Sequence, residues 1–227
     1  MQVPLLDLRA QYSPLKAEIL EAVSELCDSQ RFILGPKVEA FEQELAAYCQ
    51  SGGAVGVTSG SDALLIALMA EKIQPGDEII IPEPCFVAYP ALATMCGAKV
   101  VTVQTRKEDS FKLTPEQLKA AITPKTKLLL LSYPSNPTGG VLNEDTYNAL
   151  CDIARDKGIT ILADEVYEPF VYEGKELCFF YPEDRNACAK WSMLWDIQRE
   201  RVMQIEKLRS ARRDLEKAES ELLSAKQ

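Results

Sequence analysis

Short apolar runs alternate with helix-like segments along most of the chain, and this alternation limits the possible folds more than any other feature. The runs are rich in isoleucine, valine and leucine and show little polar alternation. They lie at residues 54–58, 78–82, 99–104, 127–133 and 159–163. Strands that are apolar on both faces and separated by helices are typical of a parallel sheet covered on both sides. The sequence therefore predicts an α/β fold, a three-layer sandwich with a mostly parallel sheet.

The segments between the runs supply the helices of this prediction. Apolar residues recur at helical spacing over residues 14–49, with a break at the Gly-Pro pair of RFILGP. Four more helices are expected, at residues 61–73, 87–97, 114–121 and 143–157. The sequence thus predicts a helical arm at the N-terminus, followed by repeated strand–helix units.

The last part of the chain differs in composition. Residues 188–226 contain neither glycine nor proline, and Leu208, Leu215 and Leu222 recur every seven residues. A seven-residue repeat of leucine is typical of a coiled-coil helix, so we expect a long C-terminal helix that pairs with a second copy in a homodimer. A solvated amphipathic helix that covers exposed core is the alternative. The predicted division is a large domain over residues 1–176 and a helical tail over residues 177–227.

The composition excludes several classes of function. The chain has no histidine, which removes Ser-His-Asp catalysis and histidine-ligated zinc or haem. A net charge of −9 disfavours nucleic-acid and anionic-membrane partners. The seven cysteines are never spaced as CxxC and suggest reduced thiols, not a metal or disulfide framework. No uncharged run is long enough to span a bilayer. We therefore expect a cytoplasmic protein with no metal, membrane or nucleic-acid partner.

Two candidate ligand contacts follow the first two apolar runs. Gly60 and Ser61 open a helix directly after a run, where free backbone amides and a hydroxyl suit a phosphate. Taken alone, these residues are more often an ordinary serine cap. Phe86 follows the second run, where its ring can stack on a planar ligand or simply join the core. Ligands of parallel sheets bind beyond the carboxyl ends of the strands, so both positions belong to the candidate site.

Two further candidates follow the fourth and fifth runs. Asn136 lies between two prolines that restrict the backbone at the end of its run, although a tight turn alone also accounts for this pattern. Asp164 follows the apolar ILA segment, so its carboxylate needs a cationic or hydrogen-bonding partner. Together the four features offer a phosphate anchor, a ring stack, a polar contact and a counterion for a ring nitrogen. Pyridoxal 5′-phosphate has this set of groups.

Longer motifs resemble the fold-type I pyridoxal-phosphate-dependent aminotransferases, as a composite of two branches. Residues 1–82, including RFILGPKVEAFEQ and VTSGSDALLIAL, are similar to the sugar aminotransferases. Residues 83–174, including YPSNPTGG and ADEVY, are similar to the aspartate and aromatic amino-acid aminotransferases. The tail over residues 183–227 matches neither branch. The resemblance implies a truncated, chimeric aminotransferase large domain.

The resemblance implies a cofactor-binding role for six residues. Gly60 and Ser61 hold the phosphate, Phe86 stacks on the pyridine ring, Asn136 and Tyr167 contact the ring hydroxyl, and Asp164 pairs with the ring nitrogen. Asp164 would keep that nitrogen protonated, which makes the ring an electron sink.

The chain departs from the family where the family carries its Schiff-base lysine. The corresponding stretch reads CFFYPEDRN, with Asp184 and Arg185 where lysine is required. Arginine stays protonated and cannot act as the amine nucleophile. Lys175 and Lys190 are near in sequence but carry no motif. We therefore assign no catalytic residue and expect pyridoxal phosphate to bind non-covalently.

The sequence leaves two functions open. The first is an aminotransferase that moves an amino group between an amino acid and a keto acid or keto sugar, with turnover impaired by the missing lysine. The second is a non-catalytic aminotransferase-like domain that acts as a binding or oligomerisation module through its tail. A nucleotide-binding domain is disfavoured, because no GxGxxG or Walker motif is present. Without the strands around the missing lysine, residues 54–58 lack a neighbour, for which residues 177–181 are a candidate replacement.

Overall fold

The computed structural model describes residues 7–49, 51–167, 171 and 190–193. The chain divides into two compact units, Met1–Gly56 and Val57–Gln227, which are described separately. The predicted domain boundary between residues 176 and 177 lies outside the described residues. Within the described ranges, no helix combines the length and apolar character needed to cross a bilayer.

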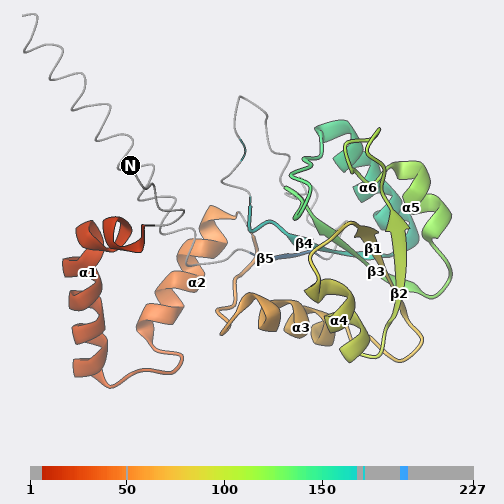
Figure 1. Cartoon of the computed structure of the whole chain (residues 1–227). Helices are drawn as coiled ribbons and strands as arrows, with labels where there is room; N and C mark the ends of the chain where they lie inside the picture. Colours follow the sequence, from red (N-terminus) through yellow and green to blue (C-terminus); the bar gives the residue numbers. More distant parts are fainter. Residues whose placement is uncertain (1–6, 50, 168–170, 172–189, 194–227) are drawn as a thin grey trace, which may run out of the picture. The chain divides into compact units, whose positions relative to one another are not determined.

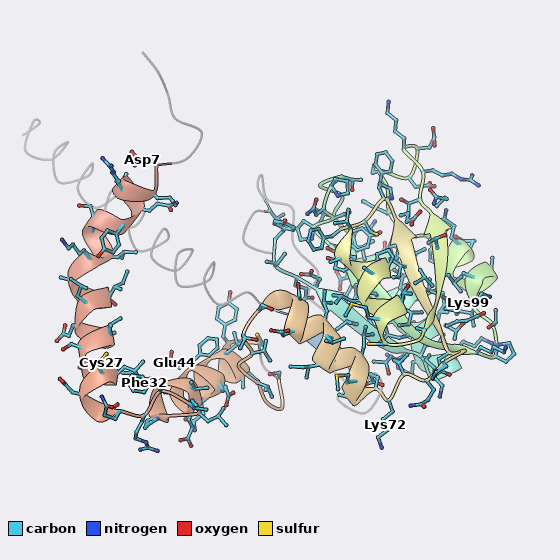
Figure 2. All side chains as sticks on the ribbon, turned by 60° about the horizontal axis from the view of Figure 1, so that its bottom comes forward. Asp7, Cys27, Phe32, Glu44, Lys72 and Lys99 are labelled. Carbon is cyan, nitrogen blue, oxygen red and sulfur yellow. The ribbon has the colours of Figure 1, made fainter. Side chains whose placement is uncertain are left out.

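The first unit contains helices α1 (Leu8–Ser29) and α2 (Pro36–Tyr48). The Asp7 side chain caps α1 by accepting hydrogen bonds from the backbone amides of Arg9 and Ala10, at 3.1 and 3.0 Å (Figure 2). A Cβ on Gly35 would lie 2.5 Å from the Arg31 carbonyl oxygen, so the turn between the helices requires glycine. The predicted helices and their break are confirmed, but neither helix buries a residue.

The second unit is a parallel sheet with helices on both faces (Figure 1). Its strands, in spatial order β2-β1-β3-β4-β5, all pair in parallel. The strands are β1 (Glu78–Glu83), β2 (Lys99–Gln104), β3 (Thr126–Ser132), β4 (Thr160–Asp164) and β5 (Lys190–Met193). The helices are α3 (Gly60–Ala70), α4 (Ala88–Met95), α5 (Pro115–Ala121) and α6 (Glu144–Lys157). The α/β fold with a parallel sheet is therefore confirmed.

Two apolar layers pack against the sheet because successive strand residues face opposite sides. Ile79 and Ile81 pack with residues of α3 and α4, whereas Ile80 between them packs with residues of α5 and α6. Leu128 and Leu129 of β3 divide in the same way. Strands buried on both faces explain why the apolar runs in the sequence lack polar alternation.

Local signals fix the ends of the helices on the α5–α6 side. Thr114 and Gln117 form a reciprocal capping box at the start of α5. The Asn143 side chain caps α6 by accepting from the Thr146 amide at 3.1 Å, and Gly158 ends α6 in the left-handed conformation with φ of 65°. These helices match the predicted ranges to within one residue.

Two expectations about the strands and the tail are wrong, and a third concerns residues that the structure does not describe. Residues 54–58 form no strand, because none of the described strands pairs with them; β2 and β5 are the edges of the sheet. Residues 190–193 form β5, so residues 188–226 are not one continuous helix. Strand pairing there satisfies the backbone at the free edge of β4, which a lone helix cannot do. The candidate strand at 177–181 and the rest of the tail lie outside the described residues.

Candidate functional site

The carboxyl ends of three strands place most of the predicted site residues at one edge of the sheet. Ser132, the last residue of β3, is paired in register with Asp164, the last residue of β4. Phe86 follows the end of β1, while Asn136 and Tyr167 follow β3 and β4. The parallel topology thus brings together residues that are about 30 to 80 positions apart in the sequence.

Helix α3 brings its amino-terminal end to the same edge. The Thr160 hydroxyl, at the start of β4, donates a hydrogen bond to Glu71 Oε2 at 3.0 Å, just after the end of α3. This contact places the carboxyl end of α3 beside the start of β4, and Figure 1 shows the helix running along the sheet in the direction opposite to β4. Its 11 residues rise about 16 Å, and the five residues of β4 extend about as far. Gly60 and Ser61, the first two residues of α3, are thus at the level of Asp164.

Asp164 is a buried carboxylate held by two donors. Its exposed fraction is 7%. The Tyr89 hydroxyl donates to Oδ2 at 2.6 Å, and the Val166 amide donates to Oδ1 at 3.2 Å. Burial raises the pKa of Asp164, as does the nearby charge of Glu165, while the two hydrogen bonds lower it. Burial disfavours the ionised form of Asp164, so a cation placed beside the carboxylate would stabilise it.

Glu78 is a buried acid with a structural role, and it offers a comparison for Asp164. It lies at the opposite edge of the sheet, at the start of β1, and is 4% exposed. It accepts from the Thr123 hydroxyl and forms an ion pair with Lys99 at 2.9 Å. These hydrogen bonds lower the pKa of Glu78. No ion pair among the described residues involves Asp164, so its buried charge lacks the compensation that Glu78 has.

Phe86 and Tyr89 form an aromatic pair beside Asp164. Their ring centroids are 5.6 Å apart, with an interplanar angle of 73°. Tyr89 is almost completely buried, whereas Phe86 is 42% exposed. The exposed ring at the strand edge offers a surface on which a planar ligand can stack.

Asn136 and Tyr167 contact each other across the ends of β3 and β4. The Asn136 side-chain amide donates to the Tyr167 hydroxyl at 3.2 Å, and both residues are half-buried. This pair brings a side-chain amide and a phenol hydroxyl to one point, where both can contact a polar substituent of a ligand.

The start of α3 presents free backbone amides. Ser59 caps the helix by accepting from the Asp62 amide at 3.1 Å, and the serine hydroxyl donates to the Asp62 carboxylate at 2.9 Å. Hydrogen bonds from Thr58 and Ser59 lower the pKa of Asp62. Gly60 is buried and Ser61 is exposed. The serine cap considered from the sequence is thus present, formed by Ser59, which leaves the Ser61 hydroxyl for a ligand.

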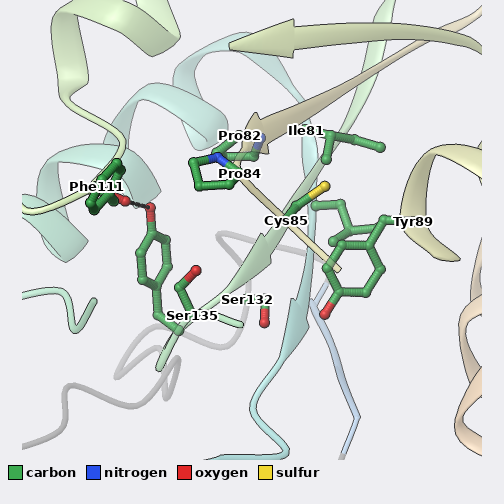
Figure 3. A pocket seen from close by; sticks show the side chains of 10 residues that line it. Ile81, Pro82, Pro84, Cys85, Tyr89, Phe111, Ser132 and Ser135 are labelled. Carbon is green, nitrogen blue, oxygen red and sulfur yellow. Dashed lines mark hydrogen bonds between the residues drawn. The ribbon is translucent and has the colours of Figure 1, made fainter. Parts of the chain in front are cut away.

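Sequence reasoning missed two residues of this region, Tyr89 and Ser132. Both line a pocket at the ends of β1 and β3, and Figure 3 shows their hydroxyl groups on the same side of it. Ser132 Oγ is buried and, within the described part of the chain, is the one buried side-chain atom without a hydrogen-bond partner. It faces Tyr89 closely enough to lower the pKa of that hydroxyl, against the larger rise that burial causes, but the geometry falls short of a hydrogen bond. The sequence held one signal for Tyr89: it is a tyrosine in an apolar helix, three residues after Phe86, and a buried tyrosine hydroxyl needs a hydrogen-bond partner.

The family described as aminotransferase class I and II matches residues 8–189, which include every residue of this site. The chain belongs to the class I and II aminotransferases. The cofactor of these fold-type I enzymes is pyridoxal 5′-phosphate.

Relatives from both expected branches are found, which confirms the composite resemblance. The chain is 42% identical over 163 residues to the dTDP-3-amino-3,4,6-trideoxy-alpha-D-glucose transaminase of Streptomyces venezuelae, covering 72% of this chain and 41% of the relative. It is 39% identical over 132 residues to the aspartate aminotransferase of Musicola paradisiaca (strain Ech703), covering 58% of this chain and 33% of the relative.

Solved structures agree with both branches. The S. venezuelae aminotransferase DesV matches with a TM-score of 0.63 at 40% identity, over 71% of this chain and 42% of that chain. The aromatic aminotransferase of Pyrococcus horikoshii OT3 matches with a TM-score of 0.61 at 30% identity, over 71% and 46%. The chain spans 33 to 41% of the length of the two curated relatives.

The candidate lysines receive little support from the described part of the aminotransferase fold. Lys190 is the first residue of β5 and is paired in register with Ile161, three residues before Asp164. Its backbone is therefore about 10 Å along the strand from the edge that carries the site. Lys175 and the stretch CFFYPEDRN lie outside the described residues.

Proposed function

We propose that this chain binds pyridoxal 5′-phosphate non-covalently at the carboxyl edge of its sheet and is impaired in amino transfer. The observation that carries the proposal is the buried Asp164 carboxylate, held by Tyr89 and Val166 without a cationic partner among the described residues. A protonated pyridine nitrogen supplies the missing cation. The orphan Ser132 hydroxyl nearby is a second polar group that fits a polar ligand better than a dry core.

The remaining residues suit the other parts of the cofactor. The amides of Gly60 and Ser61 at the start of α3 are suited to the phosphate. The exposed face of Phe86 is suited to stacking on the ring, and the Asn136–Tyr167 pair to holding the ring hydroxyl. When bound, pyridoxal phosphate supplies an electron sink for chemistry at the α-carbon of an amino acid.

Impairment follows from the sequence departure at the attachment position. A lysine there both links the cofactor and moves a proton at the substrate, whereas neither Asp184 nor Arg185 has an amine that can form the link, and a permanently protonated arginine cannot act as a base. The relatives are named as transaminases of a sugar nucleotide and of aspartate. We therefore infer that the substrate class of the lineage is an amino acid with a keto acid or keto sugar, and that this chain turns it over negligibly.

The first prediction is reversible, saturable binding of pyridoxal phosphate to the purified protein, followed by absorbance. After borohydride reduction and peptide mass mapping, we expect no labelled lysine, and we expect keto-acid release no faster than with free cofactor. Asn136→Ala should weaken binding about tenfold, because it removes a buried polar contact. Asn148→Ala, on an exposed position of α6, is the matched control and should bind normally.

Two outcomes would contradict this proposal in different ways. A single labelled lysine, at Lys175 or Lys190, together with turnover would show that the site has its own nucleophile and overturn the impairment. Absence of saturable binding, or equal weakening by Asn136→Ala and Asn148→Ala, would overturn the cofactor site itself.

A homodimer is the second part of the proposal, and the first unit supports it. Leu8, Tyr12, Ile19 and Val23 lie at helical spacing along α1, with exposed fractions between 41 and 56%. An exposed apolar stripe of this kind is typical of an interaction surface.

The second prediction is that the protein sediments as a dimer and that Ile19→Lys with Val23→Lys shifts it to the monomer mass. Charged side chains at these two positions would be buried without partners in a helix–helix contact. Glu18→Lys with Glu21→Lys changes charge on the same helix without adding it to the stripe and should leave the mass unchanged. A monomeric wild-type protein would refute the dimer.

A further inference from the structure

We propose that Tyr89 is a positioning residue that fixes the orientation of the Asp164 carboxylate toward the ring nitrogen. The inference deepens the proposed function and rests on it for the identity of the ligand. Tyr89 reaches Asp164 from α4, a different element from the strand that carries the acid, and the contact joins residues 75 positions apart. No motif in the sequence assigns a role to Tyr89.

The geometry explains why a second anchor is needed. The terminal torsion of an aspartate side chain is broad and nearly two-fold, so one hydrogen bond leaves the carboxylate free to turn. The Val166 amide holds Oδ1 at 3.2 Å, and the Tyr89 hydroxyl holds Oδ2 at the shorter distance of 2.6 Å. With both oxygens held, the plane of the carboxylate is set, and the remaining lone pairs keep one direction.

The Tyr89 hydroxyl donates to Asp164 although a second polar group, Ser132 Oγ, lies in the same pocket. A tyrosine hydroxyl has a single proton, and it must be directed to the carboxylate if it is to hold it. Ser132 Oγ lies in the same pocket as the Tyr89 hydroxyl and has no hydrogen-bond partner (Figure 3). The Tyr89 proton is donated to Asp164 and not to Ser132, because Ser132 Oγ has no hydrogen-bond partner.

Tyr89 also connects the acid to the stacking ring. Its ring meets Phe86 edge to face, at a centroid distance of 5.6 Å. One side chain thus contacts both the counterion and the ring platform of the proposed site. Tyr89→Phe separates the two contacts, because it removes the hydroxyl and keeps the ring.

The first arm of the test needs no ligand. Asp164 is followed by carbon NMR of selectively labelled aspartate in the full chain and assigned with Asp164→Asn. The groups that face this pair are Glu165 next to Asp164 and Cys85 next to Tyr89. Tyr89→Phe should raise the titration midpoint of Asp164 by about one pH unit, because a donor to the ionised form is lost. Tyr147→Phe, a buried tyrosine of α6, should not move it. An unchanged midpoint in Tyr89→Phe would overturn the proposal.

The second arm uses pyridoxine 5′-phosphate, which cannot link to an amine, and its analogue with carbon in place of the ring nitrogen. Tyr89→Phe should weaken binding of the nitrogen compound about tenfold and leave the analogue unchanged. Equal loss for both compounds would show that Tyr89 only shapes the pocket and would overturn its positioning role. If the wild-type protein binds neither compound, the proposed function fails, whereas the ligand-free arm still decides whether Tyr89 holds Asp164.

Discussion

Asp164→Asn is expected to weaken pyridoxal phosphate binding by more than a hundredfold. Removing one partner of a buried ion pair costs about 3–5 kcal/mol, and each 1.4 kcal/mol is a factor of ten in affinity. The aspartate is 7% exposed, so water cannot replace the lost charge. The measurement is a binding titration at neutral pH by absorbance of the cofactor.

The same substitution is expected to stabilise the ligand-free protein. Burial raises the pKa of Asp164 above its ordinary value of 3.8. A raised pKa means that the native state holds its proton longer than the unfolded state, so stability falls as pH rises from about 3.8 through the raised pKa. Asparagine has no charge to bury. The stability gain of Asp164→Asn should therefore be absent at low pH and grow through this window.

Asp152→Asn provides the control for both effects. Asp152 is an exposed acid of α6 that forms an ion pair with Arg155 on the surface. Its replacement should leave cofactor affinity unchanged and show no stability gain with rising pH. Two results would contradict this role: normal cofactor binding by Asp164→Asn, or lower stability of Asp164→Asn than of the wild type at neutral pH. Either result would show that Asp164 is a structural acid like Glu78.

The sequence predicted the elements of the second unit well because buried parallel strands leave a clear signal. The strand at 99–104 was predicted with its observed limits, and β4 differs by one residue at each end. The topology then places Asp164 and Ser132 side by side, since ends of parallel strands share an edge. Candidate residues that follow strands could thus be grouped from the sequence alone.

Contacts that depend on pairing between distant segments could not be predicted in this way. Residues 54–58 have the composition of a strand, but a strand forms only where a neighbour completes its hydrogen bonds. Residues 190–193 lie in a helix-like sequence and form β5 because β4 offers a free edge. Tyr89 was missed for a related reason. Its role depends on a hydrogen bond to Asp164. Composition and periodicity indicate that a side chain is buried, but they do not indicate which residue it contacts.

Leu129→Ala is expected to lower the free energy of unfolding by about 2–5 kcal/mol, the range for a buried leucine truncated in a core. Leu129 is fully buried in β3, the central strand, and is paired in register with Ile80 of β1 and Ile161 of β4. Its side chain belongs to the cluster beneath α5 and α6. The neighbouring side chains on β1, on β4 and on the covering helices are close-packed. They cannot move far enough to fill the space that the shorter alanine side chain leaves, so a cavity remains. Urea denaturation of the full chain, followed by circular dichroism, measures the change.

Ile66→Ala is the matched control, because it removes a similar volume from a side chain of α3 that is 45% exposed. Its effect should stay near 0.5 kcal/mol, as for ordinary surface positions. A domain of this kind is stable by only about 5–15 kcal/mol, so Leu129→Ala should unfold measurably earlier while Ile66→Ala should not. Equal effects of the two substitutions would mean that β3 is not the buried centre of the sheet. The register that places Ser132 beside Asp164 would then lose its support, because β3 carries both Leu129 and Ser132.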